Sequence, residues 1–199
     1  FVNAPKLHTQ LGANILNKLM KLPKRLESEF SSEVNFYYHA APIYWNKALY
    51  DLSILECQGL NIADSYKKKS ISKNYKDFAF LLINSSLFFY YWIVMSDCYN
   101  LTQKYIAEIK VPTSLERDVL HELADNLNRR LNSTIQIAEY TYKNKGTVRF
   151  AQFFPKKSKS LIDEIDKALA KHYGFTEEEL DFIINYDIKY RMGDDLNTV

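Results

Sequence analysis

Glycine, histidine and cysteine are all scarce in this sequence of 199 residues, which has 5 Gly, 4 His and 2 Cys. None of the glycines forms the Gly-x-Gly, P-loop or Gly-x-Ser-x-Gly patterns that bring a backbone close to a phosphate or expose a nucleophile. His8, His39, His121 and His172 are scattered and form no His-Glu-x-x-His motif. The sequence therefore indicates no zinc site and no standard hydrolase site.

Cys57 and Cys98 lie far apart and form no Cys-x-x-Cys motif. Two isolated cysteines suit a reducing compartment better than a secreted fold built on disulfides, so we expect a cytoplasmic protein. The sequence begins at Phe1 without an initiator Met and without the basic, apolar and small-residue regions of a signal peptide. We therefore expect the natural chain to extend upstream.

A large excess of charge of one sign is also missing, because 26 basic residues face 24 acidic ones and leave a net charge of +2. A nucleic-acid ligand would therefore have to bind a local basic patch and not the whole surface. The segment Lys67–Lys73, with the sequence KKKSISK, is the clearest such patch. The same pattern is also typical of a solvated strand edge that resists aggregation.

Hydrophobic residues make up 47% of the chain and aromatic residues 15%, so a sizeable core is expected. The longest apolar run is Phe78–Met95, whose length alone is compatible with a membrane span. Asn84, Ser85 and Ser86 stand at its centre, and Asp77 and Asp97 bracket it. These polar residues favour a buried core helix with a bend, and we expect no membrane partner.

Helical periodicity predicts a first helix over 11–30, interrupted at Pro23, and a short helix over 101–109. Thr113 and Glu116 have the spacing of a capping box, which predicts a long helix from there to about Lys143, ended by Asn144-Lys145-Gly146. A helix over 160–173 should stop at Gly174. A second capping box, Thr176 with Glu179, should start a last helix that runs to about Met192.

Aromatic and β-branched residues favour extended structure between Tyr37 and Ile71, near Val111 and over 147–154. The expected fold class is α+β: a small, mostly antiparallel sheet from 37–71 with the strand near Val111, packed on the buried apolar helix. The long helix and the C-terminal helices would form an appendage. We expect a division into residues 1–112 and 113–199.

Candidate nuclease residues are limited to two short fragments, Glu108-Ile109-Lys110 and Asp187-Ile188-Lys189. A metal-dependent nuclease needs clustered carboxylates and a lysine, but acidic-x-Lys triplets arise by chance in charged helices. We therefore predict no catalytic, cofactor-binding or metal-binding residue in this chain.

Two segments resemble a known family. The first, Ala79–Pro112, is similar to the target-recognition regions of adenine-N6 DNA methyltransferases, including combined restriction–modification enzymes with TaqI-like specificity domains. The matching residues are Ile83-Asn84-Ser85, Phe88–Trp92, Ser96-Asp97, Leu101–Ile106 and Ile109–Pro112.

The second segment, Phe153–Gly193, resembles the C-terminal tail of the same enzymes. Its core runs from Ile162-Asp163-Glu164-Ile165-Asp166 through His172-Tyr173-Gly174-Phe175-Thr176 to Asn185-Tyr186-Asp187-Ile188-Lys189-Tyr190-Arg191. The sequence lacks the glycine-bearing loop and the Asn/Asp-Pro-Pro-aromatic loop of the methyltransferase catalytic domain.

The resemblance implies a division of labour. S-adenosylmethionine and the flipped adenine would be bound by a catalytic methyltransferase domain of the same parent chain, with or without endonuclease activity. The present segment, residues 1–112 above all, would recognise double-stranded DNA and position it for that domain.

Under this interpretation, lysines would neutralise phosphates, and neighbouring polar or planar side chains would read base edges in the major groove. The candidate DNA-binding residues on the first patch are Lys67, Lys68, Lys69, Ser70, Ser72, Lys73, Asn74, Tyr38, His39 and Asn46. A second possible contact with the DNA backbone comprises Arg149, Lys156 and Lys157.

Three other functions remain open from the residues alone. A helical protein–protein interaction module would dock a partner through the helix after Thr113 and would leave an apolar seam exposed. A membrane-associated protein would use Phe78–Met95. A nuclease would use the fragment at Asp187 and Lys189.

Overall fold

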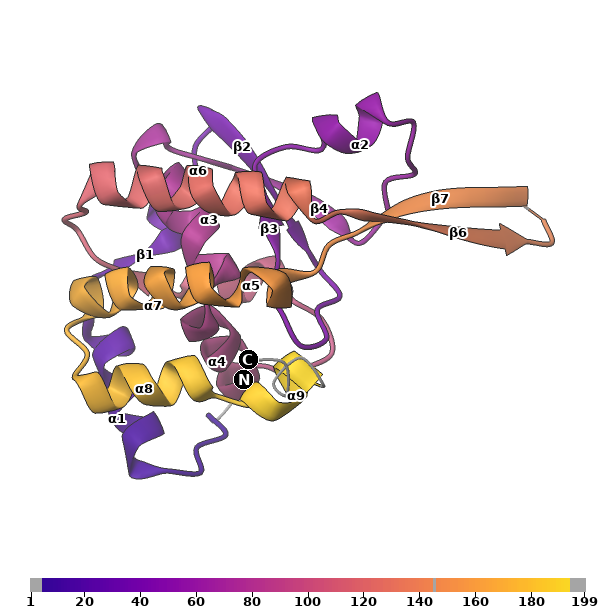
Figure 1. Cartoon of the computed structure of the whole chain (residues 1–199). Coiled ribbons are helices and arrows are strands. Elements are labelled where there is room, and N and C mark those ends of the chain that lie inside the picture. The colour runs from indigo at the N-terminus through magenta and orange to yellow at the C-terminus, as the bar shows by residue number, and fades with distance from the viewer. Residues whose placement is uncertain (1–4, 145, 194–199) are drawn as a thin grey trace.

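A computed structural model of the chain, which describes residues 5–144 and 146–193, contains helices and small antiparallel sheets as expected for an α+β fold (Figure 1). Helix α1 (Gln10–Lys21) begins after Thr9, whose side chain accepts a hydrogen bond from the Gly12 N–H. It ends just before Pro23, as predicted, because the residue that precedes a proline, here Leu22, is pushed out of the helical conformation.

A three-stranded antiparallel sheet with the order β3-β2-β4 confirms the strands expected between residues 37 and 71. The central strand β2 (Val34–His39) pairs with β3 (Ala48–Leu49) on one side and with β4 (Tyr66–Ile71) on the other. Phe36 and Tyr38 lie two residues apart on β2, so they share one face of the strand. Both are buried on that face, which packs toward α3. Strand β4 is therefore an edge strand.

The strand near Val111 does not join this sheet, which corrects the expectation above. Strand β5 (Lys110–Val111) pairs instead with β1 (Lys24–Arg25), in a separate two-stranded sheet. The short helix η1 (Leu26–Glu29) follows β1 and contacts α5 (Gln103–Glu108). The short segments α2 (Ser53–Cys57) and η2 (Lys73–Tyr75) flank β4 along the chain.

The apolar run forms two helices, α3 (Lys76–Asn84) and α4 (Ser86–Met95), which meet at an angle of 70°. The predicted bend at Asn84–Ser86 is confirmed, because the Ser85 side chain caps α4 by accepting from the Phe88 N–H. Within the described residues, no single helix is both long and apolar enough for a membrane span. The bent pair meets that criterion by length and composition alone.

Asn84 also completes the sheet. Its side-chain carbonyl accepts from the Ala48 N–H at 3.1 Å, and its amide donates to the Ala48 carbonyl at 3.2 Å. The side chain thus replaces a fourth strand beside β3, and both of its polar atoms are satisfied inside the core.

The long helix expected over 113–143 is wrong at both ends. Helix α6 (Arg117–Ser133) starts later, and no side-chain capping bond forms at its N-cap, Glu116. After Thr134 the chain turns into β6 (Gln136–Tyr142) and β7 (Gly146–Gln152), which pair as a hairpin. Gly146 has a φ of +69°, so Asn144 and Gly146 belong to a hairpin turn, while Lys145 lies outside the described residues.

The C-terminal helices follow the predicted pattern. After η3 (Pro155–Ser158), helix α7 (Lys159–Tyr173) ends at Gly174, whose φ is +67°. The capping box of Thr176 with Glu179 forms at the start of α8 (Glu177–Asn185). The predicted last helix is interrupted, because Asp187 has a φ of +52° and the chain restarts as α9 (Ile188–Met192).

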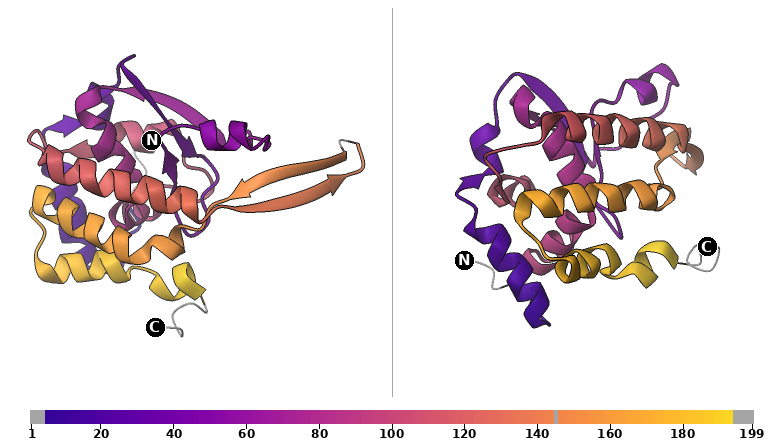
Figure 2. Two further views of the ribbon diagram at one scale, coloured as in Figure 1. Left: turned by 45° about the horizontal axis from the view of Figure 1, so that its top comes forward. Right: turned by 60° about the vertical axis from the view of Figure 1, so that its left-hand side comes forward.

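Helices α6, α7 and α8 lie side by side as a layer over α3 and α4 (Figures 1 and 2). Their buried residues belong to the same hydrophobic core as those of α1, α3, α4 and the three-stranded sheet. The helices after residue 113 thus pack into the common core, while the β6–β7 hairpin extends away from it (Figure 2).

Candidate nucleic-acid interface

The lysine run forms strand β4, and its alternation places neighbouring lysines on opposite faces. Lys68 pairs with Tyr37 of β2 and shares its face, whereas Lys67 and Lys69 point to the other face. Lys67 and Lys68 are exposed, and their ammonium groups contact no carboxylate among the described residues. The Lys69 ammonium lies 3.9 Å from the centroid of the Phe30 ring, so its charge is partly engaged.

The two serines of the run take part in the fold. The Ser70 hydroxyl donates to the Asn35 side chain at 2.7 Å, and the Ser72 hydroxyl donates to the Glu29 carboxylate at 2.7 Å. Glu29 also forms an ion pair with Lys24. Ser72 therefore joins β4 to η1, and neither hydroxyl is free to read a base without breaking an internal hydrogen bond.

Three other candidates are poorly placed for contact with DNA. Tyr38 is 5% exposed and Asn46 is 2% exposed, so their selection as base-reading residues was wrong. His39 is half-buried, and its Nε2 lies 2.9 Å from the Ser65 hydroxyl. Burial, together with the nearby Lys47 charge, lowers the pKa of His39 to about 4, so this side chain offers no positive charge at neutral pH.

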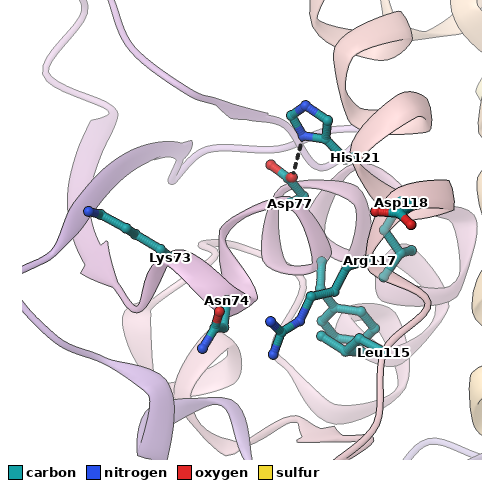
Figure 3. A pocket seen from close by; sticks show the side chains of 9 residues that line it. Lys73, Asn74, Asp77, Leu115, Arg117, Asp118 and His121 are labelled. Carbon is teal, nitrogen blue, oxygen red and sulfur yellow. Dashed lines mark hydrogen bonds and ion pairs between the residues drawn. The ribbon is translucent and has the colours of Figure 1, made fainter.

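Lys73 and Asn74 border a pocket of about 230 Å³ between η2, α3 and the start of α6 (Figure 3). Arg117 extends toward Asn74 across the pocket, while the Lys73 ammonium points away from it. Asp77 and Asp118 contribute negative charge to the same wall. The lining is therefore of mixed charge, and no serine, threonine or cysteine lines it within the described residues.

Asp77 links the side chains of Tyr50 and His121 beside this pocket. Its carboxylate accepts from the Tyr50 hydroxyl at 2.5 Å and pairs with His121 Nδ1 at 2.8 Å. The hydrogen bond and the charge of Asp77 raise the pKa of the exposed His121, which favours its cationic form. Sequence reasoning missed this pair, because Asp77 and His121 lie on different helices and form no local motif.

The second candidate group lies on and beside the hairpin. Arg149 sits on β7, 3.1 Å from the Glu139 carboxylate of β6. The Arg149 backbone is also fixed to Asn61 by two hydrogen bonds, which join the middle of β7 to the segment before β4. Lys156 and Lys157 belong to η3. Lys157 is exposed, with its ammonium 5.0 Å from the Phe154 ring centroid.

The hairpin has two chemically different faces. Tyr140, Tyr142 and Phe150 share one face, and the Tyr140 and Phe150 ring centroids are 6.2 Å apart. The other face is more polar. It carries the Glu139–Arg149 ion pair and the pair Thr141–Thr147, whose hydroxyls are 3.1 Å apart. Sequence reasoning expected β6 to be helical and did not identify this surface.

The described residues contain no group of three or more His, Cys, Asp or Glu side chains able to hold a metal ion. Glu108 ends α5, whereas Asp187 stands at the break between α8 and α9. The two acidic-x-Lys fragments therefore do not build a recognisable nuclease centre in this part of the chain.

Comparison of the chain with protein-family models, curated proteins and solved structures finds no match.

Proposed function

We propose that this chain is a sequence-specific DNA-recognition segment of an adenine-N6 DNA methyltransferase or restriction–modification enzyme. It would hold double-stranded DNA for a catalytic domain of the same parent chain, and that domain would bind S-adenosylmethionine. The observation that carries the proposal is the projecting β6–β7 hairpin, whose strand β7 is hydrogen-bonded at Arg149 to Asn61, five residues before the lysine strand β4 begins (Figure 1).

A two-stranded ribbon is one of the elements that the major groove of DNA admits. Each hairpin strand has 7 residues, which corresponds to a length of roughly 23 Å at about 3.3 Å per residue. On the polar face, Arg149 is the side chain suited to guanine, and the hydroxyls of Thr141 and Thr147 suit several bases. Arg149 would exchange its contact with Glu139 for one with a base.

Phosphate contacts would come from ammonium groups that lack an internal counter-charge. Lys67, Lys68 and Lys73 fulfil this condition among the described residues, and they follow one another from the start of β4 to η2. Their charges are exposed, so neutralising DNA phosphates requires no internal ion pair to break. Such contacts between lysines and phosphates give an affinity that depends on salt concentration and not on DNA sequence.

The experiment is a fluorescence-anisotropy titration of the protein against a randomised duplex pool at 50 mM and 200 mM salt. Binding should weaken with salt. The triple variant Lys67→Ala, Lys68→Ala, Lys73→Ala should reduce the slope of log affinity against log salt by about 2 to 3, since each phosphate contact contributes about 0.9.

A matched control replaces three exposed lysines of α1 and α7, Lys21, Lys167 and Lys171, with alanine. This variant changes net charge equally, so an equal loss of affinity would show that the binding is only diffuse electrostatics. Selection of preferred sequences from the pool, by the wild type and by Arg149→Ala, then tests base reading by the hairpin. Identical preferences would contradict a reading role for Arg149.

The alternative of a helical interaction module loses its main support. The apolar residues Leu120, Ala124, Leu127 and Leu131 of α6 are buried in the protein's own core. Val119 is exposed, but it does not form a continuous seam with them. Docking through α6 would therefore require the helix to leave its contacts with α3 and α7.

A further inference from the structure

A second surface site lies where the loop between β2 and β3 meets the segment after the hairpin. It is a pocket of about 370 Å³, within the usual size range of small-molecule sites. Its walls include the aromatic side chains of Tyr44, Trp45, Phe153 and Phe154, and its polar lining includes Lys47 and His39.

The cation in this pocket is flanked by aromatic rings and by no carboxylate of the described residues. The Lys47 ammonium lies 4.8 Å from the Phe153 ring centroid and 5.2 Å from the Tyr66 ring centroid. It has no ion pair or side-chain hydrogen bond with any residue that the structure describes. An ammonium flanked by aromatic rings is poorly hydrated, so an incoming anion gains more from contact with it than with a lysine in open solvent.

The aromatic wall is held in place before any ligand arrives. The Trp45 indole N–H donates to the Arg191 carbonyl at 3.0 Å, and the Arg191 guanidinium carbon lies 4.0 Å from the Trp45 ring centroid. Arg191 is itself buried between Trp45 and Phe89. Because helix α9 fixes the indole, binding does not have to order this side chain, which lowers its entropic cost.

We propose that this pocket binds one nucleotide unit, with the planar base against the aromatic wall and the phosphate on the Lys47 ammonium. A nucleotide combines a π-face and an anion within a short distance, which is the pair of features that the pocket offers. Paired bases inside a duplex are stacked and do not present such a face. The source is therefore a free mononucleotide or an unpaired strand, and the site is independent of duplex binding by the hairpin and β4.

Burial lowers the pKa of Lys47 to about 8. Its charge is therefore present at pH 7 and is lost as the pH rises through about 8. Affinity for a phosphate-bearing ligand should fall over the same interval, whereas affinity for the corresponding nucleoside should not change.

Tryptophan fluorescence provides a local readout, because Trp45 lines the pocket whereas Trp92 is 1% exposed in the core. The titration uses AMP, adenosine and inorganic phosphate as probes. AMP should change the emission of Trp45 with saturation, adenosine should do so with about tenfold lower affinity, and phosphate alone should have little effect.

The variant Lys47→Met keeps the length of the side chain but removes its charge. It should bind adenosine as the wild type does and AMP about tenfold more weakly, so that the two ligands become equal. Lys21→Met, at an exposed position of α1 outside the pocket, is the matched control and should bind AMP normally. Absence of any Trp45 response to AMP, or equal AMP affinity in Lys47→Met and wild type, would overturn the proposal.

The same readout separates the two sources. A single-stranded tetranucleotide that binds at least tenfold more tightly than AMP, in a manner that depends on Lys47, identifies an unpaired strand. Equal affinities identify a free nucleotide. Duplex binding in the anisotropy assay should be unaffected by Lys47→Met, so failure of this site and failure of the proposed function give different results.

Discussion

The helices α3 and α4 and the β6–β7 hairpin represent opposite ways of using a similar content of aromatic and β-branched residues. In α3, α4 and Ser85 between them almost every side chain is buried, including those of polar Asn84, Ser85 and Ser86. In the hairpin the strands are mostly exposed, and Tyr140 and Tyr142 are each about half accessible. The difference indicates that the helices stabilise the fold, whereas the hairpin presents a surface.

The sharpest test of this comparison is a pair of aromatic-to-alanine substitutions. Phe80→Ala removes a fully buried ring that stacks on Tyr50 at 4.2 Å, and should lower the free energy of unfolding by about 3–5 kcal/mol. Tyr140→Ala, in the exposed hairpin, should lower it by less than about 1 kcal/mol. Urea denaturation measures both. Similar losses would contradict the assignment of the hairpin as a surface element.

A second test concerns the polar residue at the end of α3. Asn84→Ala leaves the N–H and the carbonyl of Ala48 without their buried partner, and should cost about 2–4 kcal/mol. Asn14→Ala, at an exposed position of α1, is the control and should have almost no effect. If the two variants unfold at the same denaturant concentration, Asn84 does not complete the sheet as described.

The third test uses pH. Asp166 on α7 is buried and accepts the backbone N–H groups of Ser86 and Leu87 at the start of α4. Burial raises its pKa from 3.8 to about 6, although these hydrogen bonds and Arg191 oppose the shift. Since the folded protein holds this proton more tightly than the unfolded chain, Asp166 contributes stability below about pH 4 that is lost as the pH rises to about 6.

The variant Asp166→Asn lacks this titration. Its free energy of unfolding, relative to the wild type, should therefore increase between pH 4 and pH 6 and stay constant above that, as measured by urea denaturation at each pH. A constant difference across the range would show that Asp166 does not titrate in the folded protein.

The smallest expected effect on stability comes from removing the hairpin. Gln136 and Gln152 are paired across its base, so replacing residues 137–151 with Asn-Gly provides a two-residue turn. The free energy of unfolding should change by about 1 kcal/mol or less, while affinity for duplex DNA should fall at least tenfold. Loss of folding would place the hairpin among the elements that the core needs.

Several features could be predicted from local sequence, because their causes are local. Pro23 ends α1, Gly174 ends α7, and Thr176 with Glu179 caps α8, all within one turn of the residues concerned. The bend between α3 and α4 was predictable because Asn84, Ser85 and Ser86 interrupt an apolar run. The prediction of one long helix failed because Leu127, Leu131 and Ile135 keep helical spacing up to the point where β6 begins. The apolar pattern therefore does not mark the change from helix to strand.

The candidate site was only partly predictable. The lysine strand was visible as a run of charge, but its division between two faces required the pairing of β4 with β2. Tyr38 and Asn46 appeared suitable for base reading, yet the fold buries them. Lys47, Trp45 and Phe153 show no common motif, because the pocket that they share joins segments more than a hundred residues apart.

The sequence by itself determined the ends of α1 and α7, the cap of α8, the α+β class and the identity of the apolar core segment, since these depend on side chains within a few residues of each other. Only the tertiary structure decided which partners each element received. Asp166 reaches the start of α4, Asn84 completes the sheet beside β3, and Asn61 binds the middle of β7. Such pairings arise from packing between distant segments, where a buried polar group takes the partner that the whole fold brings within reach.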